Sequence, residues 1–138
     1  MAIEFGLMGQ ATVQLEDSVL RIFQSQVQGN ESDNESGGQL FARFDSGKTI
    51  ITIATPPRPT DRRWRYRFFP DRNAERREIT EYYKVGLHYV GDWHTHPQQV
   101  PQPSSNDIQS MQDCFRKSKH GLNSFLIIIV GTDPLPGG

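Results

Sequence analysis

GDWHTHPQQVPQPSSND, residues 91–107, is the segment that predicts both the local fold and the position of the candidate functional residues. Its first residues end a predicted strand over 87–94, and the prolines that follow interrupt regular structure. A helix is expected to begin at Ser104 or Ser105, because either hydroxyl can cap it and Asp107 places negative charge in its first turn. The apolar face of that helix is formed by Ile108, Met111, Cys114 and Phe115.

Two histidines at the end of the predicted strand are candidate metal ligands. Alternate side chains of a strand share a face, so His94 and His96 can direct imidazole nitrogens at one ion. Catalytic zinc sites use three protein ligands and leave one position for water, and Asp107 would complete a His-His-Asp set. An isolated His-x-His pair is also common without a metal. The added spacing to Pro97, Ser104 and Asp107 favours the metal site.

Two further segments have the periodicity of amphipathic helices. Before Gly29, apolar residues Val19, Phe23 and Val27 recur every four residues, as one face of a helix requires. Residues 73–85 carry no Pro or Gly and mix helix formers with charges. The apolar edge of this second predicted helix is formed by Ile79, Tyr82 and Tyr83.

The remaining ordered segments are predicted to be strands. Residues 39–44 and 48–55 are joined by the turn sequence DSGK, which predicts an antiparallel hairpin. The β-branched run at 124–132 is typical of a strand buried on both faces. Helices and strands therefore intermingle, and the predicted fold class is mixed α/β (α+β), a mixed sheet flanked by helices.

The residues from 94 to 107 resemble the signature of the JAMM, or MPN-plus, family of JAB-type zinc metallopeptidases. That signature is a glutamate well upstream, then HxHP, six residues, a serine, two residues and an aspartate, and the downstream part is complete here. The family glutamate lies three residues before a glycine that opens a hydrophobic strand. Glu35 precedes Gly38 in ESGGQLF at that spacing, and Glu31 is a weaker candidate. Ala42 departs from the pattern, because the family usually has a further glycine there.

The resemblance implies an MPN/JAB-like (cytidine-deaminase-like) fold and a hydrolytic mechanism. Zn²⁺ held by His94, His96 and Asp107 would lower the pKa of its water toward ~7. Glu35 would be the general base that collects the proton and passes it to the leaving amine. The Ser104 hydroxyl and the zinc would stabilise the oxyanion. Each residue also has a simpler structural interpretation: a cap at Ser104, a complement to the helix dipole at Asp107, and a solvated loop residue at Glu35.

The motif contexts GDWHTHP and PQPSSND are most similar to a bacterial branch of that family, found beside E1- and E2-like proteins in antiphage systems of the CBASS type. The resemblance implies a deconjugating (iso)peptidase that hydrolyses the bond between the C-terminus of a modifier-like protein and its target. In CBASS, a cGAS-like nucleotidyltransferase is the protein joined to the target. Two alternatives stay open: a JAB peptidase that processes a ubiquitin-like or sulfur-carrier protein outside immunity, and a non-catalytic MPN scaffold.

Length and composition limit the other classes of function. A chain of 138 residues fits one domain, 1–138, and family members commonly continue, so a further element past Gly138 is expected. The net charge of -1 does not favour a nucleic-acid binder. One cysteine, Cys114, excludes an internal disulfide and a Cys-rich zinc site, which favours a cytoplasmic protein. The longest apolar run, 125–130, is far short of the ~20 residues of a membrane span.

Arginines alternate with aromatic residues in RRWRYR, residues 62–67. Arginine and aromatic side chains together can bind nucleic acids by phosphate contact and base stacking. In a half-exposed strand, however, Trp64 and Tyr66 would face one side and the arginines after Arg62 the other, with acidic residues nearby. The predicted role is a solvated edge or a docking surface for a protein substrate.

Overall fold

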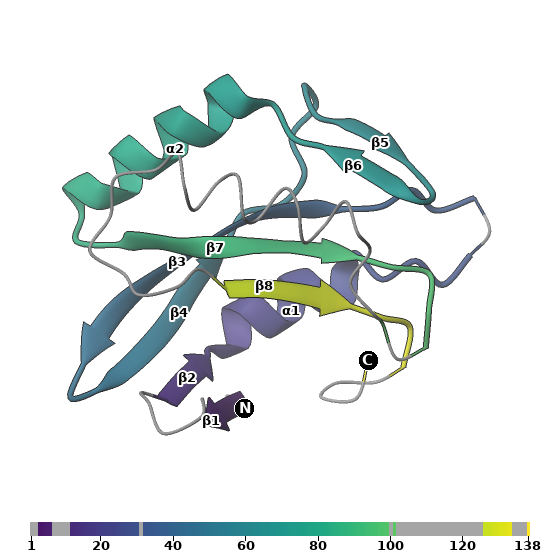
Figure 1. The fold of residues 1–138 in the computed structure, drawn as a ribbon. Coiled ribbons are helices and arrows are strands. Elements are labelled where there is room, and N and C mark those ends of the chain that lie inside the picture. The colour runs from purple at the N-terminus through teal and green to yellow at the C-terminus, as the bar shows by residue number, and fades with distance from the viewer. Residues whose placement is uncertain (1–2, 7–11, 31, 100, 102–125, 134–137) are drawn as a thin grey trace.

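A mixed six-stranded sheet forms the centre of the protein, in the strand order β1-β2-β4-β3-β7-β8 (Figure 1). The computed structural model describes residues 3–6, 12–30, 32–99, 101, 126–133 and 138. The strands of the sheet are β1 (Ile3–Gly6), β2 (Thr12–Leu15), β3 (Gly37–Asp45), β4 (Lys48–Ala54), β7 (His88–Thr95) and β8 (Leu126–Val130). Neighbouring strands are antiparallel except for the pairs β2–β4 and β7–β8, which are parallel. The mixed α/β class predicted from the sequence is confirmed.

Helix α1 (Asp17–Ser25) covers one face of the sheet and confirms the first predicted helix. Its apolar stripe is buried, and the ring of Phe23 lies 5.1 Å from that of Trp93 on β7. Burying a side chain of this size stabilises a fold by about 1.5–3 kcal/mol. The main core therefore lies between α1 and the sheet, and its strand residues include Leu40, Ile51 and Val90.

Helix α2 (Arg72–Lys84) packs on the opposite face and confirms the second predicted helix. Asp71 caps it, since its carboxylate accepts hydrogen bonds from the backbone N–H groups of the first turn. Tyr82 stacks on Phe41 of β3 with ring centroids 4.4 Å apart. Tyr83 was expected on the same apolar edge, but it is 66% exposed. The two buried residues of the helix, Ala74 and Glu75, lie at its other end.

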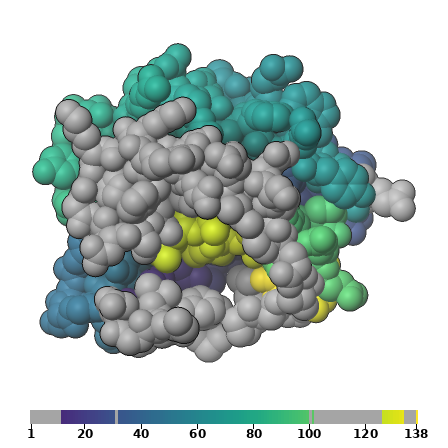
Figure 2. Space-filling model, viewed as in Figure 1, coloured from purple at the N-terminus to yellow at the C-terminus, as the bar shows by residue number. Residues whose placement is uncertain are grey.

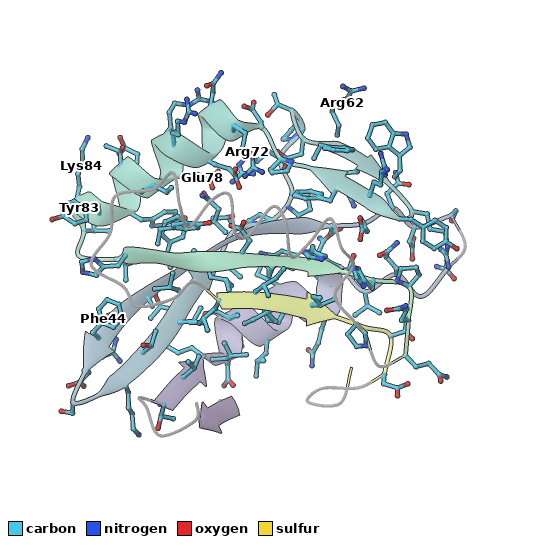
Figure 3. The ribbon with its side chains drawn as sticks, in the orientation of Figure 1. Phe44, Arg62, Arg72, Glu78, Tyr83 and Lys84 are labelled. Atoms are coloured by element: carbon cyan, nitrogen blue, oxygen red, sulfur yellow. The ribbon has the colours of Figure 1, made fainter. Side chains whose placement is uncertain are left out.

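The arginine and aromatic segment forms a small hairpin, β5 (Arg62–Trp64) and β6 (Arg67–Phe69). The expectation of one alternating strand through this segment is wrong, because the chain turns at residues 65–66. Arg62 and Trp64 lie on the exposed side, and Figure 3 shows Arg62 pointing away from the body of the protein. Arg63 points inward and bonds to the chain around Glu35.

Near the chain ends, the structure adds one pair of strands and bears on two sequence expectations. The pair β1–β2 was not predicted, because neither strand is longer than four residues. Strand β8 was predicted, but four of its five residues are half-buried rather than buried on both faces. Figure 2 shows β8 in yellow, reaching the surface of the molecule. The helix expected from Ser104 lies outside the described residues.

Two glycines allow close approaches that hold the central strands together. A Cβ atom at Gly38 would lie 1.9 Å from the carbonyl oxygen of Thr55, and one at Gly91 would lie 1.9 Å from that of Leu126. Any larger residue at either position would therefore push β3 or β7 away from its neighbour. In the part of the chain that the structure describes, no helix is long and apolar enough to cross a membrane.

Candidate metal centre

The pairing of β3 with β7 brings Glu35 beside the two histidines. The strands are antiparallel, and Gly37 at the start of β3 pairs with His94 near the end of β7. Just before this pair, the Ser36 carbonyl accepts a hydrogen bond of 2.8 Å from the Thr95 backbone N–H. A carboxylate and two imidazoles from segments distant in sequence therefore meet at one end of the sheet.

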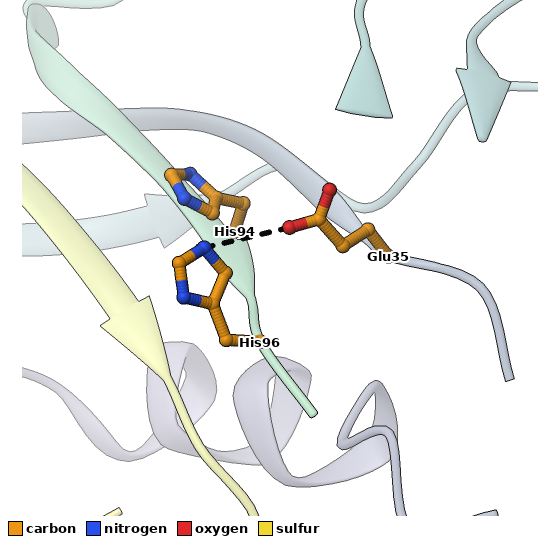
Figure 4. A group of neighbouring side chains, drawn as sticks. All are labelled: Glu35, His94 and His96. Atoms are coloured by element: carbon orange, nitrogen blue, oxygen red, sulfur yellow. Dashed lines mark ion pairs between the residues drawn. The ribbon is translucent and has the colours of Figure 1, made fainter. Parts of the chain in front are cut away.

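Glu35, His94 and His96 form a compact buried group (Figure 4). Their potential ligand atoms all lie within 4.8 Å of one another. The Glu35 Oε1 to His96 Nε2 distance is 3.5 Å, and the two imidazole centroids are 5.0 Å apart. All three residues are at most 9% exposed. This confirms that His94 and His96 face the same way, as the strand alternation predicts.

A β-bulge in β7 sets which side the histidines face. Leu40 pairs with Gly91 and Phe41 with Tyr89, so Val90 is an extra residue in β7. Val90 belongs to the core under α1, whereas the Tyr89 hydroxyl donates a 2.7 Å hydrogen bond to Asp92 on the α2 side. Asp92 and the residues two and four positions later therefore share the α2 face.

His88 does not belong to this group. With strict alternation along β7, His88 would face the same side of the sheet as His94, but the extra residue Val90 between them breaks the alternation. The His88 side chain is exposed and contacts the rings of Phe44 and Tyr83, at centroid distances of 5.3 and 5.7 Å. Figure 3 shows Phe44 and Tyr83 at the end of the molecule opposite Arg62. Among the described residues, His88 therefore lies outside the group formed by Glu35, His94 and His96.

The backbone of Glu35 is held by the β5–β6 hairpin. Its N–H donates to the Trp64 carbonyl at 2.6 Å, and the Arg63 Nε donates to the Glu35 carbonyl at 2.8 Å. Glu35 is thus a buried residue, not the solvated loop residue of the simpler interpretation. Sequence reasoning missed Arg63 as a neighbour of the site, because the arginine and aromatic pattern indicated a surface strand.

The donor set fits a divalent transition-metal ion. Two imidazoles with a carboxylate close by are the ligand types that zinc and similar ions take in hydrolytic enzymes. Such an ion would also compensate for burying a carboxylate, which is costly without a cation. Ser104 and Asp107, predicted as a catalytic residue and the third ligand, lie outside the described residues. The same holds for Glu31 and Cys114.

Two more carboxyl groups lie between α2 and β7: that of Glu75 is buried and that of Asp92 belongs to a half-buried residue. Burial raises the pKa of Asp92, while the hydrogen bond from Tyr89 acts in the opposite direction. Burial, followed by repulsion from Asp92, raises the pKa of Glu75 from 4.5 to about 7. The ion pair of Glu75 with Arg72, at 2.9 Å, only partly offsets these effects. Near neutral pH, ionised Glu75 is therefore a destabilising feature of the folded state.

We expect Glu75 to make the protein less stable as pH rises. A native-state pKa above the unfolded value means that this contribution to stability is full below pH 4.5 and is lost toward pH 7. The loss is on the order of 1–3 kcal/mol. Glu75→Gln removes this pH dependence. In urea unfolding, the free energy of unfolding of the variant relative to that of wild type should therefore increase between pH 5 and pH 8. Parallel stability profiles for the two proteins would contradict this assignment.

Comparison with known proteins agrees with this architecture. Residues 17–136 match the family of prokaryotic homologs of the JAB domain. A CD-NTase/cGAS isopeptidase of Enterobacter hormaechei is 36% identical over 104 residues, which cover 73% of this chain and 57% of that protein. One of Pseudomonas aeruginosa is 31% identical over 123 residues, covering 86% and 76%. A probable metalloprotease of Sinorhizobium fredii is 35% identical over 89 residues, covering 61% and 54%.

A solved structure shows the same fold. The solution structure of a protein from Desulfitobacterium hafniense superposes with a TM-score of 0.53 at 21% identity, covering 69% of this chain and 64% of that one. The present chain spans little more than half the length of the Enterobacter relative, at 57%. The family match nevertheless runs through both helices, the central strands and the Glu35–His94–His96 group. The chain therefore belongs to the family of prokaryotic JAB-domain proteins.

Proposed function

We propose that this protein is a zinc-dependent isopeptidase that hydrolyses the bond between the C-terminus of a modifier-like protein and its target. The observation that carries the proposal is the buried group of Glu35, His94 and His96, a carboxylate beside two potential metal ligands. Family membership and the peptidase names of the relatives support the same class of reaction. A non-catalytic scaffold would have no need to bury these three polar side chains together.

His94 and His96 are the residues that would hold the metal, with Asp107 as the proposed third ligand. When bound, zinc supplies Lewis acidity, which polarises a carbonyl and brings the pKa of a water molecule toward ~7. Two neutral imidazoles and one carboxylate would leave the ion and its three ligands with a net positive charge, which the neighbouring Glu35 carboxylate would offset. The donor chemistry thus matches a hydrolytic centre rather than a closed structural site, which is typically rich in cysteine.

Glu35 is the proposed general base. Its carboxylate lies 3.5 Å from the His96 ring, so a water molecule at the metal site would be within its reach. In the proposed reaction the water oxygen attacks the amide carbon, Glu35 takes a proton from the water, and the proton passes to the amine as the C–N bond breaks. The Ser104 hydroxyl is the proposed hydrogen-bond donor to the oxyanion. No covalent enzyme intermediate is needed.

A bacterial antiphage conjugation system of the CBASS type is the proposed setting. The relatives from Enterobacter and Pseudomonas are named CD-NTase/cGAS isopeptidases, which supports a cGAS-like nucleotidyltransferase as the conjugated protein. E1- and E2-like proteins would then build the bond that this enzyme removes. We place the reaction in the cytoplasm, consistent with a chain that has a single cysteine.

A cleavage assay with three fusion proteins tests this function. Each fusion joins a reporter through a peptide bond to the C-terminal tail of a cGAS-like nucleotidyltransferase, of a sulfur-carrier protein, or of a scrambled nucleotidyltransferase sequence. We expect cleavage of the first alone, with mass spectrometry placing the cut directly after the nucleotidyltransferase C-terminus. Cleavage of the sulfur-carrier fusion alone would establish the alternative outside immunity. A zinc-loaded protein that cleaves none of them would support the scaffold.

A further inference from the structure

A group of buried polar side chains lies beneath the candidate metal centre, on the other face of the same strands. Side chains alternate along a strand, so Ser36 and Thr95 point away from the face that carries Glu35 and His94. They meet Gln26 and Gln28 from the segment that follows α1. Ser36, Thr95 and Gln28 are each at most 2% exposed. We call Gln28, Ser36 and Thr95 the support cluster.

We propose that Thr95 and Gln28 are positioning residues that fix the distance between Glu35 and the two histidines. Thr95 lies between His94 and His96, and Ser36 directly follows Glu35 in the chain. A bond between Thr95 and Ser36 therefore joins the segment carrying the proposed base to the segment carrying the proposed ligands. This inference rests on the proposed function and adds residues to which neither the family signature nor the mechanism assigns a role.

Thr95 makes the central connection of the support cluster. Its Oγ1 accepts a hydrogen bond of 2.9 Å from the Ser36 backbone N–H and donates one of 2.9 Å to Gln28 Oε1. Its own N–H donates to the Ser36 carbonyl at 2.8 Å. The hydroxyl thus extends the β3–β7 pairing by one residue toward Glu35. A methyl group at this position would leave the Ser36 N–H buried without its acceptor.

Gln28 carries this connection outward to two loops. Its Nε2 donates to the carbonyl of Asp33, at 3.1 Å, and to the carbonyl of Arg65 in the β5–β6 turn, at 2.7 Å. Both amide protons and the amide oxygen are therefore used. One side chain holds the loop before Glu35 and the hairpin beside Glu35 against β7.

Arg63 and Gln26 hold the same segment from the side. The Ser36 hydroxyl donates to Gln26 Oε1 and accepts from Arg63 Nη2, both at 2.7 Å. A hydrogen-bonded polar network specifies one geometry, whereas an apolar core of similar volume tolerates repacking. A misplacement of about 1 Å can reduce the rate of an enzyme by about 10²-fold. Polar residues here thus set the geometry of the site.

The test compares three threonine variants in steady-state kinetics on the cleaved fusion. Thr95→Val removes the hydroxyl with little change in shape, and we expect kcat to fall about 10- to 100-fold with KM and zinc content unchanged. Thr95→Ser restores the hydroxyl and should return kcat to within about threefold. Thr55→Val is the matched control, because Thr55 Oγ1 is also a buried acceptor, for the Gln39 N–H at 2.8 Å. It should lose similar stability while kcat stays near wild type.

A second readout is independent of turnover. In metal-free protein at one fixed pH, the ¹H–¹⁵N signals of the His94 and His96 rings report the place of the neighbouring Glu35 carboxylate. We expect these signals to move in Thr95→Val and in Gln28→Met, and to coincide with wild type in Thr95→Ser and Thr55→Val. Gln28→Met removes the hydrogen bonds that Gln28 makes to Thr95 and to the two loops. It tests the same inference if Thr95→Val does not fold.

Failure of the proposed function and failure of the positioning role would give different experimental results. Wild-type protein that cleaves no fusion defeats the proposed function, while the ring spectra still test the positioning role. Equal losses of kcat in Thr95→Val and Thr55→Val would show a general effect of destabilisation and overturn the inference. Unchanged kcat and unchanged ring signals in folded Thr95→Val or Gln28→Met would do the same.

Discussion

Glu35→Gln should lower kcat by about 10²–10⁴-fold, the usual contribution of a general base, while the protein stays folded and keeps its metal. Glutamine has the size and shape of glutamate but cannot take up a proton at neutral pH. Because Glu35 is buried with its backbone held by Trp64 and Arg63, the variant should keep the local structure. Cleavage of the fusion, followed by gel or mass spectrometry, measures the effect.

The matched control for this prediction is Glu75→Gln. Glu75 is also a buried carboxyl group, but it lies on α2 and has no proposed role in the reaction. Its substitution should leave kcat within about twofold of wild type. If Glu35→Gln retained wild-type kcat, another residue would have to be the base, and Glu31 would be the first to test.

Removal of the metal should abolish cleavage, and zinc should restore it in wild type but not in His94→Ala. His94 and His96 supply two of the three proposed ligands, so the loss of either imidazole should reduce affinity for the ion strongly. Chelation should also lower the melting temperature, because an ion that binds only the folded state stabilises it by about 2.7 kcal/mol at 100 times its Kd. Metal analysis, calorimetry and the cleavage assay give the three measurements.

His88→Ala is the control for the histidine variants. His88 lies on the same strand as the proposed ligands, but it is exposed and contacts Phe44 and Tyr83 instead. This variant should bind zinc and cleave the fusion as wild type does. Full activity of the chelated protein, or of His94→Ala, would refute the role of a metal in the reaction.

The sequence was informative where a pattern repeats over several turns or carries a fixed spacing. The stripe of Val19 and Phe23 was enough to place α1, and the turn at residues 45–48 was enough to place the β3–β4 hairpin. The spacing from Glu35 to Gly38, read with the family resemblance, located a glutamate that the fold brings to the two histidines. The roles of Ser104 and Asp107 remain predictions.

Other features depend on contacts that no local pattern reports. Arg63 is flanked by exposed residues of the same hairpin, so its inward turn toward Glu35 follows from the packing of β5 on the chain before β3. Gln28 looks like a polar residue at the end of a helix, yet it is 2% exposed because three separate segments bond to it. The extra residue in β7 has no signal except that Gly91 follows it.

The extra residue, Val90, divides β7 into two parts that pair with different stretches of β3. Before Val90, the strand packs Tyr89 against Phe41 beneath α2, and after it the strand pairs residues 91–94 with β3 up to Gly37. Deleting Val90 would place Tyr89 and Gly91 opposite Phe41 and Leu40 in a regular ladder, so the residues on both sides would keep their facing while the core under α1 would lose the Val90 side chain. Insertions or deletions before Val90 would therefore alter the packing of Tyr89 against Phe41. Insertions or deletions after Gly91 would instead move His94 relative to Glu35.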